Sequence, residues 1–159
     1  MTAPGMTCKQ CKSGMSLQPL DPVCGEQGML KVTLIQLPAL VCPNMHRRFA
    51  MPEFPILALE RVAGKEMETL PAGKKSGLLF KNYHCGTCGG ALDKGAGREE
   101  TFDFDVTLEG FPPFRVELTL PLHKCASCGK EQLRALDEVQ KLAPPAMARA
   151  FKAAGLHPE

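Results

Sequence analysis

The chain has 159 residues, of which 44% are hydrophobic, and its formal net charge is +2. A balance so close to neutral does not favour a polycation that binds nucleic acid through charge alone. There is no charged-then-apolar leader and no apolar run of about 18 residues, so we expect a soluble cytoplasmic protein that does not bind a membrane.

Eight cysteines are spread over a chain that also contains 15 glycines and 14 prolines. In a reducing compartment, cysteine pairs hold metal more often than they form disulfides. Metal ions commonly stabilise small units that bury too little apolar surface by themselves. The composition therefore predicts a small, metal-stabilised α+β fold.

The first cysteine pair is Cys8 and Cys11, whose Cys-x-x-Cys spacing lets two thiolates bind one face of a zinc ion. The segment before Cys42 repeats the segment before Cys125, because each has a leucine five residues and a proline four residues before the cysteine. The repeat continues upstream and sets three residues of the first half against three of the second: Thr33, Ile35 and Leu37 against Val116, Leu118 and Leu120.

In this repeat Met45 stands where Cys128 stands, and His46 is the next residue. Methionine is a poor zinc ligand, whereas an imidazole is a common one. The first predicted zinc site consists of Cys8, Cys11, Cys42 and His46. Cys24, between Pro22 and Gly25, is the alternative to His46 as fourth ligand.

The rest of the first half is predicted to contain a strand at 29–37 and a helix at 53–62. Pro55 suits a first helical turn, and Ile56, Leu59 and Val62 are expected to form the buried stripe. Residues 64–77 are rich in glycine, lysine and glutamate and are interpreted as a linker. The predicted domains are thus 1–63, a first zinc ribbon plus helix, and 78–159, a second ribbon plus C-terminal helices.

The second half carries two Cys-x-x-Cys pairs, which are separated by 36 residues and are each followed by a glycine. Glycine suits such a turn because the backbone there can need a positive φ. Four thiolates at about 2.3 Å from the ion complete a tetrahedral zinc site. The second predicted site consists of Cys85, Cys88, Cys125 and Cys128.

Between these pairs, apolar and polar residues alternate over 102–109 and again over 114–120. The period of two predicts a half-buried antiparallel hairpin, with the cysteine turns at its open end. Helices are predicted at 132–142 and 146–154, separated by Pro144 and Pro145 and ending at Gly155. Each half is therefore a zinc ribbon followed by short helices, and the chain is expected to bind two structural zinc ions. Two such sites, with charges of −2 and −1, would lower the net charge to about −1.

The Leu-Pro-Ala-Leu-Val-Cys-Pro-Asn run at 37–44 resembles the end of zinc ribbons of the YgiT type, the zinc-binding half of MqsA-like antitoxins. The segment from Leu120 through Cys125, Cys128, Gly129 and Glu131 resembles it too. The resemblance implies structural zinc at three cysteines of the first half and four of the second, and a departure from the pattern at Met45. In that family a helix-turn-helix domain binds DNA, but only about 30 residues follow Cys128 here and prolines interrupt them, so we expect no such domain in this segment. The resemblance therefore implies a protein-contacting role, as in an antitoxin, an immunity protein or an adaptor.

No motif of an enzyme is present: there is no Ser-His-Asp arrangement and no phosphate-binding loop, and the second site leaves no open position on the metal. We expect a non-catalytic protein that binds a protein partner. The alternative is a nucleic-acid-binding zinc-ribbon protein. That alternative depends on the basic residues close to the predicted ligands, namely Lys9, Lys12, Arg47, Arg48, Lys124, Lys130 and Arg134.

Overall fold

A computed structural model describes residues 2–79 and 81–157. Its centre is a four-stranded antiparallel sheet with the strand order β3-β4-β10-β9. Two hairpins supply these strands, β3 (Val23–Gln27) with β4 (Leu30–Ile35) and β9 (Glu99–Val106) with β10 (Phe114–Pro121). The predicted alternation is confirmed in β10, where Phe114, Val116 and Leu118 are buried. The opposite face of the sheet is polar, as expected for a sheet covered on one side.

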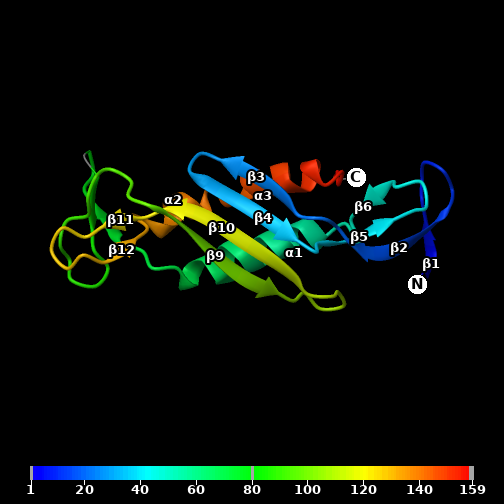
Figure 1. Cartoon of the computed structure of the whole chain (residues 1–159), viewed down its shortest axis with the longest axis horizontal. Helices are drawn as coiled ribbons and strands as arrows, with labels where there is room; N and C mark the ends of the chain where they lie inside the picture. The colour runs from blue at the N-terminus through cyan, green and yellow to red at the C-terminus, as the bar shows by residue number, and fades with distance from the viewer. Residues whose placement is uncertain (1, 80, 158–159) are drawn as a thin grey trace.

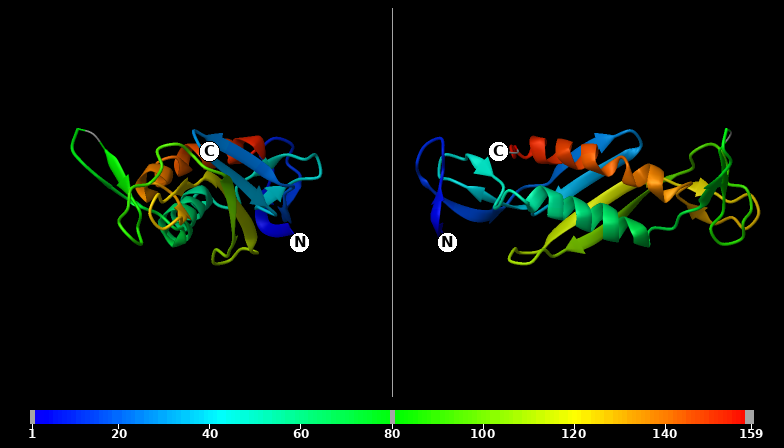
Figure 2. Two further views of the ribbon diagram at one scale, coloured as in Figure 1. Left: turned by 60° about the vertical axis from the view of Figure 1, so that its left-hand side comes forward. Right: turned by 180° about the vertical axis from the view of Figure 1, so that it is seen from behind.

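Helices cover one face of this sheet (Figure 2). Helix α1 (Phe54–Arg61) continues into a π-helical turn at Val62–Glu66 and a 3-10 turn at Met67–Thr69. Helix α2 (Leu136–Gln140) leads to α3 (Ala143–Ala153), which packs on β3 and β4. Phe54 of α1 lies against Phe114 and Phe111 of the second hairpin, with ring centroids 6.0 and 5.2 Å apart. Each helix therefore packs on the hairpin of the other half.

The molecule is elongated, and a small β-structured lobe lies at each end (Figure 1). The N-terminal lobe is a sheet of β1 (Thr2–Thr7), β2 (Gly14–Pro19), β5 (Pro38–Val41) and β6 (Arg47–Arg48). The other lobe holds two short antiparallel pairs. They are β7 (Lys74–Ser76) with β8 (Asn82–His84), and β11 (His123–Lys124) with β12 (Glu131–Gln132).

The two predicted units, 1–63 and 78–159, share one sheet and one core. β4 of the first unit pairs with β10 of the second, and a single cluster of buried side chains includes residues of both. The segment 64–77, predicted to be a linker, contributes helical turns in which Met67 is fully buried, followed by β7. The predicted boundary therefore falls inside a shared core.

The helices differ from the prediction in three respects. Ile56, predicted to belong to the buried stripe of the first helix, is 60% exposed, whereas Val62 is buried as predicted and Phe54 and Ala58 face the core with it. The predicted helix at 132–142 is reduced to Leu136–Gln140 in the structure, because Gln132 belongs to β12. Pro144 and Pro145 lie in the first turn of α3, where their missing N–H groups cost no helical hydrogen bond.

The β4–β10 pairing is symmetric about the opposed residues Thr33 and Glu117. Across the pairing, Leu34 lies opposite Val116 and Val32 lies opposite Leu118. In the internal repeat, Val32 is therefore equivalent to Val116 and Leu34 to Leu118, whereas the sequence alignment assigned these places to Thr33 and Ile35. The offset arises at Gln36, which is one extra residue in the first half and has φ +59°. The two halves are thus related by an approximate two-fold axis through the centre of the sheet.

Candidate metal centres

Each lobe brings one predicted set of ligands together. Within each set, all four ligand atoms lie within 4.8 Å of one another. No cysteine is in a disulfide. The two sets are Cys8, Cys11, Cys42 and His46 in the N-terminal lobe, and Cys85, Cys88, Cys125 and Cys128 in the other. Cys24, the alternative ligand, is exposed on β3 and belongs to neither set.

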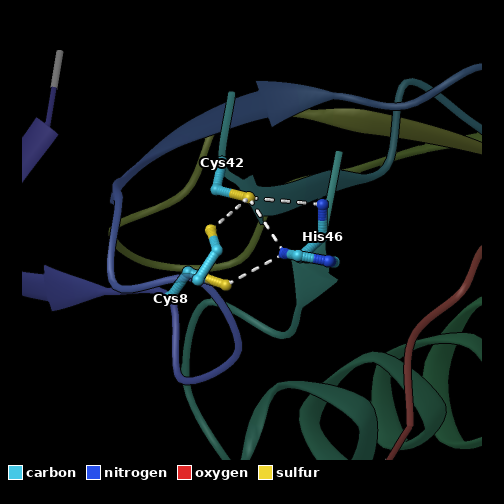
Figure 3. Close-up of side chains that lie close together, drawn as sticks. Cys8, Cys42 and His46 are labelled. Atoms are coloured by element: carbon cyan, nitrogen blue, oxygen red, sulfur yellow. Dashed lines mark hydrogen bonds between the residues drawn. The ribbon is translucent and has the colours of Figure 1, made fainter. Parts of the chain in front are cut away.

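The first set is assembled by strand pairing. The turn from β1 to β2 carries Cys8 and Cys11, the turn from β5 to β6 carries Cys42 and His46, and β2 pairs with β5. His46 Nδ1 lies 3.3 Å from Cys8 Sγ and 3.4 Å from Cys42 Sγ, and Cys11 Sγ lies 3.6 Å from Cys42 Sγ (Figure 3). The imidazole therefore points its Nδ1 atom at the sulfurs.

The turn at Cys42 is one residue shorter than the other three. At Cys8, Cys85 and Cys125, the cysteine N–H donates to the carbonyl five residues later. At Cys42 the corresponding bond goes to the carbonyl of His46, four residues later. Met45 has φ +65° and its side chain is 63% exposed, so the shorter turn directs His46 inward in its place.

The other turns also contain a residue with positive φ, directly after the second cysteine. Gly89 and Gly129 have φ +77° and +79°, which confirms the role predicted for glycine there. Lys12 takes this place after Cys11 with φ +65°. Three of the four turns thus share one backbone conformation.

In the second set, Cys88 Sγ lies 3.4 Å from Cys125 Sγ, and Cys85 Sγ lies 3.7 Å from Cys128 Sγ. An ion at about 2.3 Å from four sulfurs separates neighbouring sulfurs by about 3.8 Å in a regular tetrahedron. The sulfur spacings in both sets are close to this edge length. Cys85 and Cys125 are buried, while Cys88 and Cys128 are exposed at the end of the lobe.

Hydrogen bonds to sulfur stabilise the deprotonated form that binds metal. Backbone N–H groups of Thr87, Gly90, Ser127 and Cys128 donate to sulfurs of the second set at 3.3–3.4 Å. The backbone amide of Cys88 and the side chain of Gln132 lower the pKa of Cys85 to about 5. Side-chain hydrogen bonds of Ser13 and Asn44 lower the pKa of Cys11 to about 5.

Gln132 is a residue of this site that the sequence did not reveal. The predicted helix at 132–142 includes it, but Gln132 lies in β12 and is 1% exposed. Its Nε2 donates to Cys85 Sγ at 3.1 Å, and its Oε1 accepts from the Gly86 N–H at 2.9 Å. No spacing rule marks such a residue, although its place two residues after Lys130 puts it beside the cysteine turn.

Two histidines next to the second set are not among its ligands. His123 is 5% exposed, and its Nδ1 lies 3.0 Å from the Asp93 carbonyl oxygen. His84 Nε2 lies 3.1 Å from Ser76 Oγ. Both therefore contribute to the framework of the lobe.

Several basic residues considered for nucleic-acid binding make internal contacts. Arg47 donates to the Ala154 carbonyl at 3.0 Å, and Arg134 Nε lies 2.8 Å from Glu138 Oε1. Lys130 donates to Thr87 Oγ1 at 2.9 Å. The basic residues are also divided between the lobes, because Lys9, Lys12, Arg47 and Arg48 belong to one and Lys124, Lys130 and Arg134 to the other.

No family model, curated protein or solved structure matches this chain. Across the described residues, no helix is long and apolar enough to cross a membrane.

Proposed function

We propose that this chain is a non-catalytic zinc protein in which two structural zinc ribbons hold an interaction surface for a protein partner. The observation that carries the proposal is the presence of two sets of four ligand atoms with tetrahedral spacing, one in each lobe. Cysteine and histidine together favour zinc over the hard cations, which prefer oxygen. The resemblance to YgiT-type ribbons supports the same function, that of an antitoxin-like or adaptor protein of the cytoplasm.

The absence of an open position supports a structural role for both ions. A catalytic zinc ion keeps a position for water, with three protein ligands in the usual case. Here each set supplies four ligand atoms, which fill all four positions of a tetrahedral ion. In both clusters, backbone N–H groups also donate hydrogen bonds to sulfur. The ions would hold the turns of each lobe together, which gives a small β-lobe the stability its few buried side chains do not provide.

Zinc content tests this proposal directly. Elemental analysis of the purified chain is expected to give two zinc atoms per molecule. His46→Ala and Cys88→Ser should each retain one, whereas Cys24→Ser, which changes an exposed cysteine outside both sets, should retain two. A chain without zinc, or with disulfides between these cysteines, would contradict the proposal. Loss of one zinc atom in Cys24→Ser would show that Cys24, not His46, is the fourth ligand of the first site.

A salt titration separates the two classes of partner. Binding to nucleic acid through phosphates weakens steeply as salt rises. Because the basic residues are divided between two distant lobes, we expect no binding of mixed DNA or RNA at low salt. Salt-sensitive binding would favour the nucleic-acid function instead.

A further inference from the structure

A groove of about 390 Å³ opens between α1 and α3 on the helical face of the molecule. Buried side chains of Met147 and Phe151 contribute to it, and so does the exposed Ile56. The two helices run side by side in opposite directions (Figure 2), and the sheet lies behind them. The groove is therefore an apolar surface that nothing in the described part of the chain covers.

The outer face of α1 is apolar in the middle and acidic at both ends. Glu53, Ile56, Leu57 and Glu60 follow one another at the spacing that places residues on one side of a helix. Ile56 is 60% exposed and Leu57 is 36% exposed. Burial of these two side chains would remove a substantial apolar surface from water.

The outer face of α3 carries small and basic side chains. Ala148 borders the groove, and Arg149 and Lys152 extend into solvent beside it. The ion pairs formed among the described residues do not include Glu53, Glu60, Arg149 or Lys152. The helix on one side of the groove thus carries unpaired negative charge, and the helix on the other side carries unpaired positive charge.

We propose that a second copy of this chain occupies the groove, with a two-fold axis parallel to the two helices. This axis places α1 of each copy over α3 of its partner at the same level along the helices. Because the start of α1 lies level with the end of α3, Glu53 then faces Lys152 of the other copy and Ile56 enters its groove. A two-fold axis across the helices would instead stack α1 on α1 and bring like charges together. Charge complementarity therefore selects the first arrangement, which joins four helices in one interface.

Sedimentation of the full-length chain tests the proposal, and we expect a dimer at a concentration of ~100 μM or below. Ile56→Glu places a charge in the apolar interface and should leave a monomer over the same range. Leu79→Glu changes a residue that is 91% exposed on the β7–β8 loop, and it serves as the matched control that should dimerise normally. Both variants should keep two zinc atoms, which separates a failure of this proposal from a failure of the zinc sites.

Charge reversal tests the orientation of the two copies. Glu53→Lys and Lys152→Glu should each weaken dimerisation by about tenfold, and the double variant should recover most of the loss because opposite charges again face each other. A chain that stays monomeric at ~100 μM, or a dimer that Ile56→Glu leaves intact, overturns the proposal. A dimer lost in Leu79→Glu would place the contact at the loop and would also overturn it.

Discussion

Gln132 links the two cysteine turns of the second lobe. The residue follows the turn at Cys125, yet its side chain contacts the turn at Cys85 through one donated and one accepted hydrogen bond. A buried amide whose donor and acceptor are both paired has a fixed orientation. Partners of this kind hold metal ligands in place and strengthen binding.

Gln132→Leu is expected to weaken zinc binding in the second lobe by about tenfold, because Cys85 loses a donor and the Gly86 N–H loses its acceptor. Competition with a chelator measures this change, and the first lobe of the same molecule provides an internal reference. Gln18→Leu is the control, since the Gln18 side chain is exposed and donates to Ser16 Oγ at 3.0 Å, outside both ligand sets. Equal weakening of both sites, or of neither, would contradict the role assigned to Gln132.

At the scale of residues, the two clusters could be predicted because thiolates that bind one ion follow a short, repeated spacing. His46 could be inferred because Met45, not a cysteine, stands at the repeated ligand position. The inward orientation of His46 could not be inferred, because it depends on a turn that is one residue shorter than the other three. Gln132 was not predictable, because hydrogen bonds to sulfur leave no periodic signal. The exposure of Ile56 was missed since α1 has apolar residues on two faces, and periodicity alone does not say which face meets the sheet.

Helix α3 lies unusually close to β3 because both surfaces carry small residues. Ala146 and Ala150 are fully buried on the helix, and Gly25 lies opposite them on the strand. A Cβ atom added at Gly25 would lie 2.1 Å from the Ala146 carbonyl oxygen and 2.5 Å from the Ala150 nitrogen. Both atoms belong to the backbone, so the helix as a whole would have to move away from the sheet.

Gly25→Ala should therefore destabilise the protein by about 3 kcal/mol, at the upper end of overpacking effects. Thermal or denaturant unfolding of the zinc-loaded chain measures the difference. The control is Gly64→Ala, where no atom lies within 4 Å of the added group and a small gain in stability is expected. If the two variants were equally stable, the close packing of α3 on β3 would not hold in solution.

At the scale of elements, the β9–β10 hairpin was predictable from its strict alternation, and its register opposes Phe104 to Val116 as the pattern requires. The contact between β4 and β10 was not predictable. A period of two shows which face of a strand is buried, but it does not show which strand lies alongside. The repeat aligns Leu37 with Leu120 correctly. Upstream of these residues the alignment is wrong by one residue, because Gln36 is an additional residue in the first half. Its positive φ changes which side chains of the strand face the core.

At the scale of the molecule, the central core is separate from the side chains around each metal centre. The large cluster beneath α1 and α3 contains no ligand, whereas Cys8 and Cys42 belong to one small cluster and Cys85 and Cys125 to another. If each half were an independent zinc ribbon, removal of zinc would be expected to unfold it. The shared core changes this expectation, because β9 and β10 are held by β4 and α1 as well.

Chelation should therefore unfold the two lobes while the central sheet remains folded. Amide hydrogen exchange should become fast in β2, β5, β11 and β12 and stay slow in β4 and β10. Restoring zinc should restore protection in the lobes, which provides the control for irreversible damage. Loss of protection throughout the chain would show that the lobes support the central core.

The pairing of β4 with β10 has a consequence for any attempt to divide the protein. A fragment holding only residues 78–159 would leave the free side of β10 without hydrogen-bond partners and would remove the hairpin on which α3 packs. We expect such a fragment to dimerise. β10 of one copy would then pair antiparallel with β10 of the other, and α3 of each copy would pack on the hairpin of the other copy. The intact chain thus resembles a domain-swapped dimer whose two halves are joined in one polypeptide. Its first half, which includes α1, takes the place of the second copy.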